Sequence, residues 1–336
     1  SQTVTLRATG GEGVCIDGGA CRPALVVKPA GSYCSVDGSV VRQPSITMRS
    51  AGPIAVSMDG KAKTVRGELS LQVVSGKLSV LNRVNIEDYL RSVVPAESYA
   101  SWPVETLKAQ AVAARTYAYY QKLHRTGRDY DVRADTYDQM YGGVERETKR
   151  TDGAVQATAG MVLNHGGKPI LSQYTANSGG HTADAGAVFG TPKPYLVAHA
   201  DPASLEGKMA SWKRSYSTGE IVQALRKIGV EATGLTAIEP AVTGPSGRLV
   251  KVRLRHAKGS TVVRTRTTLA SSRVLNLPEV LMDVEKQGDR YVFRGHGHGH
   301  GVGYSQWGAA ELGGRMDHQR ILEFYYPHTV IEKMWK

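Results

Sequence analysis

The sequence has few cysteines and no long apolar run. Only 3 of its 336 residues are cysteine, and aromatic residues make up 7% of the chain. No stretch of about 18 apolar residues is present to span a bilayer, and the first residues lack the charged segment and apolar stretch of a secretory signal. We therefore expect the chain as given to be soluble. Its 41% hydrophobic content is enough to bury a substantial core.

The three cysteines lie near the N-terminus, at Cys15, Cys21 and Cys34. Their spacing matches no four-ligand zinc pattern. One disulfide with one thiol left over would suit an exported chain, and Cys15 with Cys21 gives the shortest loop. Three free buried thiols are the alternative, because a pairing cannot be read from sequence.

The formal net charge of +12 suits a polyanionic partner. Lys and Arg are nevertheless dispersed among Asp and Glu, with denser basic stretches at residues 125–133, 145–150 and 251–266. Aromatic residues do not interleave with these stretches as a nucleic-acid platform requires, so we do not expect nucleic-acid binding. A basic, solvated surface that aids solubility is the alternative.

Residues 4–81 alternate short apolar runs with Gly, Pro, Asp and Ser, which predicts an antiparallel β lobe. Two helices are expected next. Asn85 is predicted to cap the first and Pro95 to end it, while Pro103 is predicted to open the second. Glu97 would then lie between two rigid elements, at the start of a helix. Such a position suits a protonated general acid.

The remaining pattern predicts strands at residues 161–164 and 170–175, a helix at 218–228 and a hairpin within 248–267. The fold class is therefore α+β: mixed β lobes with helices and a catalytic cleft between lobes. We expect an N-terminal β lobe, a catalytic core in two pieces and an inserted β/α lobe. These are residues 1–82, residues 83–205 with 285–336, and residues 206–284.

Four spaced segments resemble the family of stage II sporulation protein D (SpoIID)-like lytic transglycosylases and the related amidase enhancers. They are residues 84–120; residues 135–143, ending in Tyr141-Gly142-Gly143; residues 174–184 with Ser178-Gly179-Gly180; and residues 299–310, followed by Tyr325-Tyr326-Pro327. Each glycine-rich piece is weak by itself, but their ordered combination is specific.

The resemblance implies cleavage of the β-1,4 bond between N-acetylmuramic acid and N-acetylglucosamine in peptidoglycan, leaving a 1,6-anhydro end. The family's catalytic glutamate falls on Glu97. Its carboxyl would protonate the leaving oxygen and then take a proton from the sugar's own C6 hydroxyl. Because that hydroxyl is the nucleophile, the second carboxylate of ordinary glycosidases is not needed.

Five further residues are candidates for substrate binding. Arg115 could pair with a muramic-acid carboxylate or hold Glu97, with a surface arginine as the alternative. Tyr174 and Ser178 could bind sugar or N-acetyl oxygens, and Ser305 and Gln306 are similar candidates. Side chains of this kind equally cap local turns.

His296, His298 and His300 invite a metal interpretation, because alternate positions on an extended strand face one way. Only His300 fits the family's Gly-His-Gly-Val-Gly pattern, so we expect it in the cleft and the other two in solvent. His181 could join a zinc site. The cysteines that accompany zinc in some relatives are missing here, so we expect no required cofactor.

Two other functions stay open. One is a noncatalytic peptidoglycan-binding module that recruits or stimulates a cell-wall amidase. The other is an ordinary glycan hydrolase that uses Asp135 or Asp138 with Glu97. In each case the chain would act outside the cytoplasm of a bacterium. Its partner would be peptidoglycan glycan, which the resemblance suggests is stripped of stem peptides.

Overall fold

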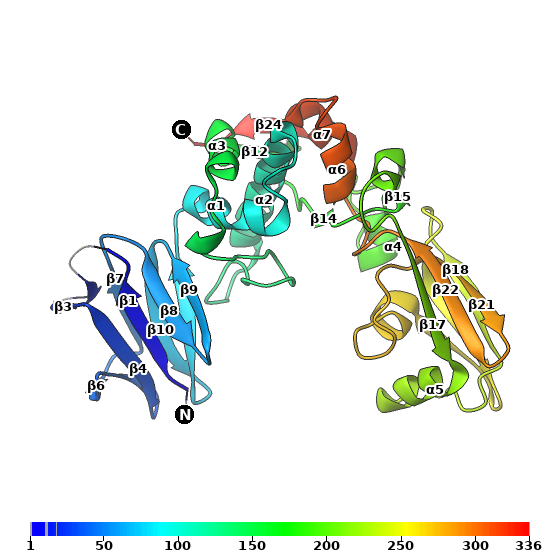
Figure 1. Cartoon of the computed structure of the whole chain (residues 1–336), viewed down its shortest axis with the longest axis horizontal. Coiled ribbons are helices and arrows are strands. Elements are labelled where there is room, and N and C mark those ends of the chain that lie inside the picture. The colour runs from blue at the N-terminus through cyan, green and yellow to red at the C-terminus, as the bar shows by residue number, and fades with distance from the viewer. Residues whose placement is uncertain (1, 11–12, 18, 336) are drawn as a thin grey trace. The chain divides into compact units, whose positions relative to one another are not determined.

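The computed structural model describes residues 2–10, 13–17 and 19–335, which adopt the expected α+β fold (Figure 1). They pack as two compact units. Unit 1 comprises residues 1–101, 118–161 and 333–336, and unit 2 comprises residues 102–117 and 162–332. Both units are discontinuous in sequence. The predicted division into three sequence segments stays a prediction, because these units follow packing and not the boundaries of modules.

Two antiparallel sheets open unit 1 and confirm the β prediction for residues 4–81. One has the strand order β6-β5-β4-β1-β8-β9 and the other β11-β10-β7-β2-β3. Alternate residues such as Val4 and Leu6 are fully buried, as expected of strands with one face on a core. The strands are β1 (Val4–Ala8), β2 (Val14–Ile16), β3 (Cys21–Arg22), β4 (Ala24–Ala30), β5 (Tyr33–Val36), β6 (Ser39–Val41), β7 (Ser45–Arg49), β8 (Ile54–Met58), β9 (Lys61–Val65), β10 (Glu68–Val74) and β11 (Lys77–Arg83).

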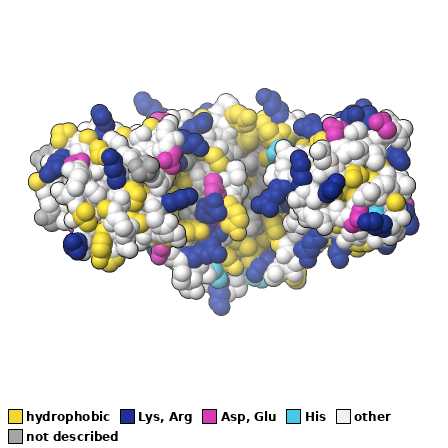
Figure 2. Space-filling view, turned by 90° about the horizontal axis from the view of Figure 1, so that it is seen from below, with side chains coloured by type: hydrophobic (Ala, Val, Ile, Leu, Met, Phe, Trp, Pro, Cys, Tyr) yellow, Lys and Arg dark blue, Asp and Glu magenta, His cyan; other side chains and the backbone are white. Residues whose placement is uncertain are grey.

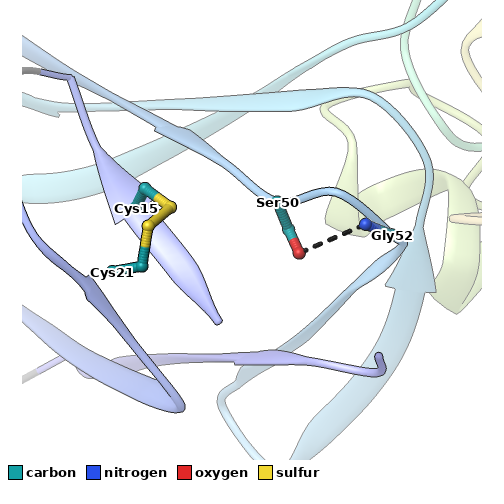
Figure 3. Close-up of a disulfide and its surroundings, with 4 residues drawn as sticks. All are labelled: Cys15, Cys21, Ser50 and Gly52. Carbon is teal, nitrogen blue, oxygen red and sulfur yellow. Dashed lines mark hydrogen bonds between the residues drawn. A yellow bond between two sulfur atoms is a disulfide. The ribbon is translucent and has the colours of Figure 1, made fainter. Parts of the chain in front are cut away.

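A disulfide joins Cys15 on β2 to Cys21 on β3, as Figure 3 shows. The two residues are direct cross-strand partners, so the bond closes the end of this short hairpin. Cys34 remains a buried thiol, and burial raises its pKa. The shortest predicted pairing is thus confirmed, and the alternative of three free thiols is wrong. A disulfide suits an oxidising compartment.

Helix α1 (Ile86–Glu97) begins as predicted but ends later. The Asn85 side chain accepts a hydrogen bond from the Glu87 backbone N–H at 2.9 Å, which confirms the cap. Pro95 lies inside the helix, so the prediction that it ends there is wrong. It removes one backbone donor in the last turn, yet the Ser98 N–H still reaches the Val94 carbonyl at 2.9 Å. Glu97 is therefore the last residue of a helix and not the first.

The second helix, α2 (Val104–His124), begins one residue after the predicted start. The Pro103 carbonyl accepts from the Leu107 N–H, so Pro103 occupies the cap position. Helix α3 (Lys149–Ala157) follows a short 3-10 turn, η1 (Val144–Arg146).

Residues after the last strand return to unit 1. The Met334 N–H donates to the Gly160 carbonyl at 2.9 Å, and the Trp335 indole N–H donates to the Glu87 carboxylate at 3.2 Å. The Trp335 ring also packs edge-on against Tyr119, with centroids 5.5 Å apart. This segment therefore supports α1 close to its first turn.

Unit 2 holds small sheets and short helices. Its sheets have the orders β13-β12-β24, β14-β23, β15-β16, β17-β22-β21 and β18-β19-β20. The strands are β12 (Met161–His165), β13 (Lys168–Pro169), β14 (Tyr174–Thr175), β15 (Gly180–His181), β16 (Ala200–Asp201), β17 (Ser211–Ser217), β18 (Ala237–Thr243), β19 (Leu249–His256), β20 (Gly259–Arg264), β21 (Leu281–Gln287), β22 (Arg290–His296), β23 (Tyr304–Ser305) and β24 (Val330–Lys333). The helical segments are α4 (Ala185–Phe189), η2 (Pro202–Leu205), α5 (Thr218–Lys227), η3 (Thr265–Leu269), α6 (Gln306–Leu312) and α7 (His318–Tyr325).

One hydrophobic core joins α5 to the sheets β17-β22-β21 and β18-β19-β20, with Ile221, Leu254 and Phe293 fully buried. The predicted helix at 218–228 and the hairpin are confirmed. The second strand of the hairpin ends at Arg264, because η3 turns away as a short π-helix. The predicted strand at 170–175 shrinks to β14.

Candidate functional site

Glu97 carries a partly exposed carboxylate at the end of α1. Its Oε1 accepts a hydrogen bond from the Met140 backbone N–H at 2.7 Å. The segment around Met140 is itself fixed on α1, because the buried Tyr89 hydroxyl donates to Gln139 at 3.0 Å and the Tyr89 ring stacks on Tyr141 at 5.2 Å. A helix end and a fixed loop thus orient this carboxylate within unit 1.

The loop that supplies Met140 is held by a buried ion pair. Asp138 has no exposed side-chain surface and accepts two hydrogen bonds from Arg125, at 2.6 and 2.5 Å. It also accepts from the Arg133 backbone N–H at 2.8 Å. Asp135 is exposed and accepts from Arg133 and from the Tyr137 N–H. Asp138 is engaged in this buried pair and Asp135 in local contacts near the surface, which argues against the use of either carboxylate as a second catalytic acid.

The Tyr141-Gly142-Gly143 motif anchors the same loop to the rest of unit 1. The Tyr141 hydroxyl donates to Asn82 on β11 at 3.0 Å, and the Gly143 N–H donates to Ser92 on α1 at 2.7 Å. Gly143 has a φ of 86°, and a Cβ there would lie 2.6 Å from the Thr64 carbonyl. The motif therefore clamps the loop that contacts Glu97.

Arg115 lies on α2 and is fully buried in unit 2. The alternative of a surface arginine is therefore wrong. A buried guanidinium requires partners, which makes this residue part of the packed interior of the helix. Contact between Arg115 and a glycan carboxylate stays a prediction.

Pairing of β14 with β23 brings two of the motif segments together. The strands are parallel, with Tyr174 opposite Tyr304 and Thr175 opposite Ser305. The Ser305 hydroxyl accepts from the Ser178 N–H at 3.1 Å and caps α6 by accepting from the Gly308 N–H. Ser305 therefore has the local capping role that the sequence left open.

Ser178 lies at the centre of a buried polar cluster. Its hydroxyl donates to Asp201 Oδ2 at 2.5 Å and lies 2.8 Å from the Ser204 hydroxyl. The Tyr325 hydroxyl also donates to Asp201 at 3.1 Å, and burial raises the pKa of this carboxyl. Ser178 and Ser305 are both fully buried, so their hydroxyls hold the Ser-Gly-Gly turn in place.

Gln306 and Tyr174 also pack inside unit 2. The Gln306 side chain is buried and donates to Gln110 on α2 at 3.4 Å. The Tyr174 ring, which is half-buried, meets Tyr117 edge-on at 6.4 Å. Direct substrate contact by either residue stays a prediction.

His300 is neutral, because burial and the nearby Arg266 and Arg248 lower its pKa to about 3. Its Nδ1 accepts from the Val302 N–H at 3.0 Å. The three histidines do not lie on one extended strand as expected. Strand β22 ends at His296, and the glycines that follow have positive φ angles. Across residues 2–10, 13–17 and 19–335, no three His, Cys, Asp or Glu side chains converge as a metal site would require.

Glycines at alternate positions let residues 297–303 pass close to the Ser-Gly-Gly turn. The His298 N–H donates to the Asn177 carbonyl at 2.9 Å, and the Asn177 N–H donates back at 3.1 Å. A Cβ on Gly297 would lie 2.7 Å from the same Asn177 carbonyl.

Arg248 is a site residue that the sequence did not reveal. It is 1% exposed, and its two terminal nitrogens donate to the Ser178 and His181 carbonyls at 2.8 Å each. It comes from the segment expected to be an inserted lobe, 70 residues beyond Ser178. No local pattern marks such a contact.

The surface is basic over a wide area. Figure 2 shows Lys and Arg side chains spread over the visible face, with fewer acidic ones among them. In the part of the chain that the structure describes, no helix is both long and apolar enough to cross a membrane.

The sequence profile of the stage II sporulation protein (SpoIID) family matches residues 74–165, which include Glu97. A domain of unknown function (DUF8618) matches residues 191–303. An uncharacterized protein of Brachyspira hyodysenteriae is 35% identical over 77% of this chain and 70% of its own length.

Two further proteins similar to this chain come from Bacillus subtilis. The amidase enhancer is 29% identical over 72% of this chain and 40% of its own length. Stage II sporulation protein D is 25% identical over 81% of this chain and 82% of its own length.

Proposed function

The chain belongs to the SpoIID family, and on that premise we propose that it is a peptidoglycan lytic transglycosylase that acts outside the cytoplasm. It would cleave the bond between N-acetylmuramic acid and N-acetylglucosamine and leave 1,6-anhydro ends. Glu97 is the proposed catalytic residue. The observation that carries this proposal is the partly exposed Glu97 carboxylate, held by the Met140 amide within the segment that matches the family.

The chemistry needs one carboxyl group that acts twice. Protonated Glu97 would give its proton to the leaving glycosidic oxygen as the bond to the anomeric carbon breaks. The carboxylate would then take the proton of the C6 hydroxyl as that oxygen bonds to the same carbon. Asp138 and Asp135, the acids of this loop, are engaged with Arg125 and Arg133, which favours a mechanism with a single carboxylate.

The test is product analysis of digested peptidoglycan by mass spectrometry. Wild type should release fragments with 1,6-anhydro ends, and Glu97→Gln should lower their yield by about 10²-fold or more. The amide oxygen of Gln can still accept from the Met140 N–H, so the fold should persist. Asp135→Asn is the matched control, because it removes an exposed carboxylate of the same loop. Unchanged yield with Glu97→Gln would overturn the proposal, and reducing ends in place of anhydro ends would show an ordinary hydrolase.

A second candidate function is stimulation of a cell-wall amidase, which the name of one relative suggests. Binding to wall glycan without cleavage would suffice for this role. Glu97→Gln separates the two functions. If it stimulates a purified amidase as well as wild type does, while wild type releases no anhydro ends, the chain acts as an enhancer.

A further inference from the structure

A small pocket of about 40 Å³ lies within unit 2, and none of the residues proposed for catalysis lines it. Three arginines contribute to its wall, Arg248, Arg264 and Arg266, together with His300. Arg248 lies just before β19, Arg264 and Arg266 lie at the end of β20 and in η3, and His300 lies in the Gly-His stretch. The fold therefore brings Arg248 and His300 next to the basic end of β20.

The charges of this pocket are incompletely balanced. The buried Glu279 carboxylate lies 3.6 Å from Arg248 and 3.5 Å from Arg266, so one negative charge is shared by two guanidinium groups. Arg264 is exposed and has no ion-pair partner among the described residues. Three positive charges less one negative charge leave an excess of two, and neutral His300 adds none. A bound anion would offset part of this excess.

Hydrogen bonds hold two arginines of the pocket in fixed positions, which favours specific binding of an anion. Arg248 is pinned by its bonds to the Ser178 and His181 carbonyls, and Arg266 donates to the Gly299 carbonyl at 2.7 Å. Guanidinium groups held in fixed positions bind carboxylates and phosphates with defined geometry. Because Arg248 donates to the Ser178 carbonyl, the pocket is also attached to the Ser-Gly-Gly turn.

The remaining wall is mixed in polarity. Ala187 and Val188 of α4, Val250 of β19 and Val280 supply apolar surface, whereas Ser246 and Thr267 supply hydroxyl groups. Carboxylates are the anions that the proposed peptidoglycan substrate offers, and they can accept hydrogen bonds from arginines and hydroxyls. A monoanionic carboxylate next to a methyl group would place its charge on the arginines and its methyl on the valines.

We propose that this pocket binds a carboxylate whose α-carbon carries a methyl group. Peptidoglycan offers two such groups: the lactyl ether of muramic acid after its stem peptide is removed, and the D-alanine end of a stem peptide. The inference rests on the proposed function for its substrate class. It assigns unit 2 a binding role of its own, independent of the chemistry at Glu97.

The test measures binding with the full chain in its Glu97→Gln form, so that glycan strands stay intact. Three probes are titrated: soluble glycan strands freed of stem peptides, the same strands with their lactyl carboxylates converted to amides, and a stem peptide ending in D-alanine. Arg264→Gln should weaken binding of the carboxylate probe about tenfold or more, because one charge-assisted hydrogen bond is lost. Arg253→Gln is the matched control, since it removes the same charge from the same sheet outside the pocket.

Several outcomes decide the proposal. Weaker binding of the amidated strands supports it, and the tighter of the two carboxylate probes identifies the source. Equal affinity of Arg264→Gln and Arg253→Gln for both carboxylate probes overturns it. Equal affinity for amidated and carboxylate strands assigns the pocket to the D-alanine end if the stem peptide binds, and overturns the proposal if the stem peptide does not bind. Arg266→Gln gives a second measurement, with thermal unfolding to show that the pocket still folds. Failure of the catalytic proposal would be distinguishable from failure of this one. Wild type would then release no anhydro ends, while binding that depends on the carboxylate would be intact.

Discussion

Asp138→Asn tests whether the loop that holds Glu97 depends on its buried ion pair. Asp138 has no exposed side-chain surface, and Arg125 is 14% exposed. Removing one partner of a buried pair costs roughly 3–5 kcal/mol, because the remaining charge is left uncompensated. Asn keeps one oxygen that can accept from Arg125, but its NH₂ group would face the other guanidinium nitrogen. We therefore expect a loss near the lower end, about 3 kcal/mol.

The assay is urea unfolding followed by tryptophan fluorescence, with product analysis in parallel. The unfolding midpoint should fall with an unchanged slope. Release of anhydro ends should also fall, because the loop positions the Met140 N–H that holds Glu97. Asp135→Asn is the control: its carboxylate is 47% exposed, so we expect little or no change.

Two results would refute this reasoning. An unfolding midpoint equal to that of Asp135→Asn would mean that the Arg125 pair does not stabilise the loop. Full stability combined with activity as low as that of Glu97→Gln would instead make Asp138 a second catalytic carboxylate.

Two further predictions concern the cluster around Ser178. Gly308→Ala should lower stability by about 1–3 kcal/mol, because the new Cβ would collide with the Tyr325 hydroxyl and lie 2.8 Å from Asp201. Gly314→Ala, whose nearest atom is 3.9 Å away, is the control, and equal melting temperatures would contradict the prediction. Burial raises the pKa of Asp201, so the folded state keeps its proton to higher pH than the unfolded chain does. Stability from this group is present below the ordinary value of 3.8 and is lost as pH rises through the folded pKa. Asp201→Asn does not titrate, so its stability deficit against wild type, measured at pH 4, 5.5 and 7, should shrink with rising pH; a deficit that grows would show that the carboxylate is stabilised as an anion.

Local signals predicted much of the secondary structure. Asn85 caps α1 because its side chain meets a free backbone donor, and that depends on near neighbours alone. The rule for Pro95 failed because a proline in the last turn removes only one hydrogen bond, while Ser98 still closes the helix. Helix existence was therefore easier to predict than a helix end.

The site was harder to predict, because it depends on the direction in which each side chain points and on contacts between residues far apart in the sequence. A serine in a glycine-rich turn can face solvent or the interior, and Ser178 faces Asp201, which lies 23 residues away. Arg248 reaches the same turn from the loop just before β19, 70 residues later in the sequence. Only the fold shows that these groups meet.

The return of residues 334 and 335 to the first unit sets an order on biosynthesis. The indole of Trp335 bonds to a carboxylate 248 positions earlier, at the beginning of the helix that bears Glu97. As the nascent chain emerges, the two N-terminal sheets can form from strands within the first 83 residues, but that helix lacks its contact with Trp335 until translation has passed position 335. The support of this helix by Trp335 should therefore form late, once the polypeptide has been made through this tryptophan.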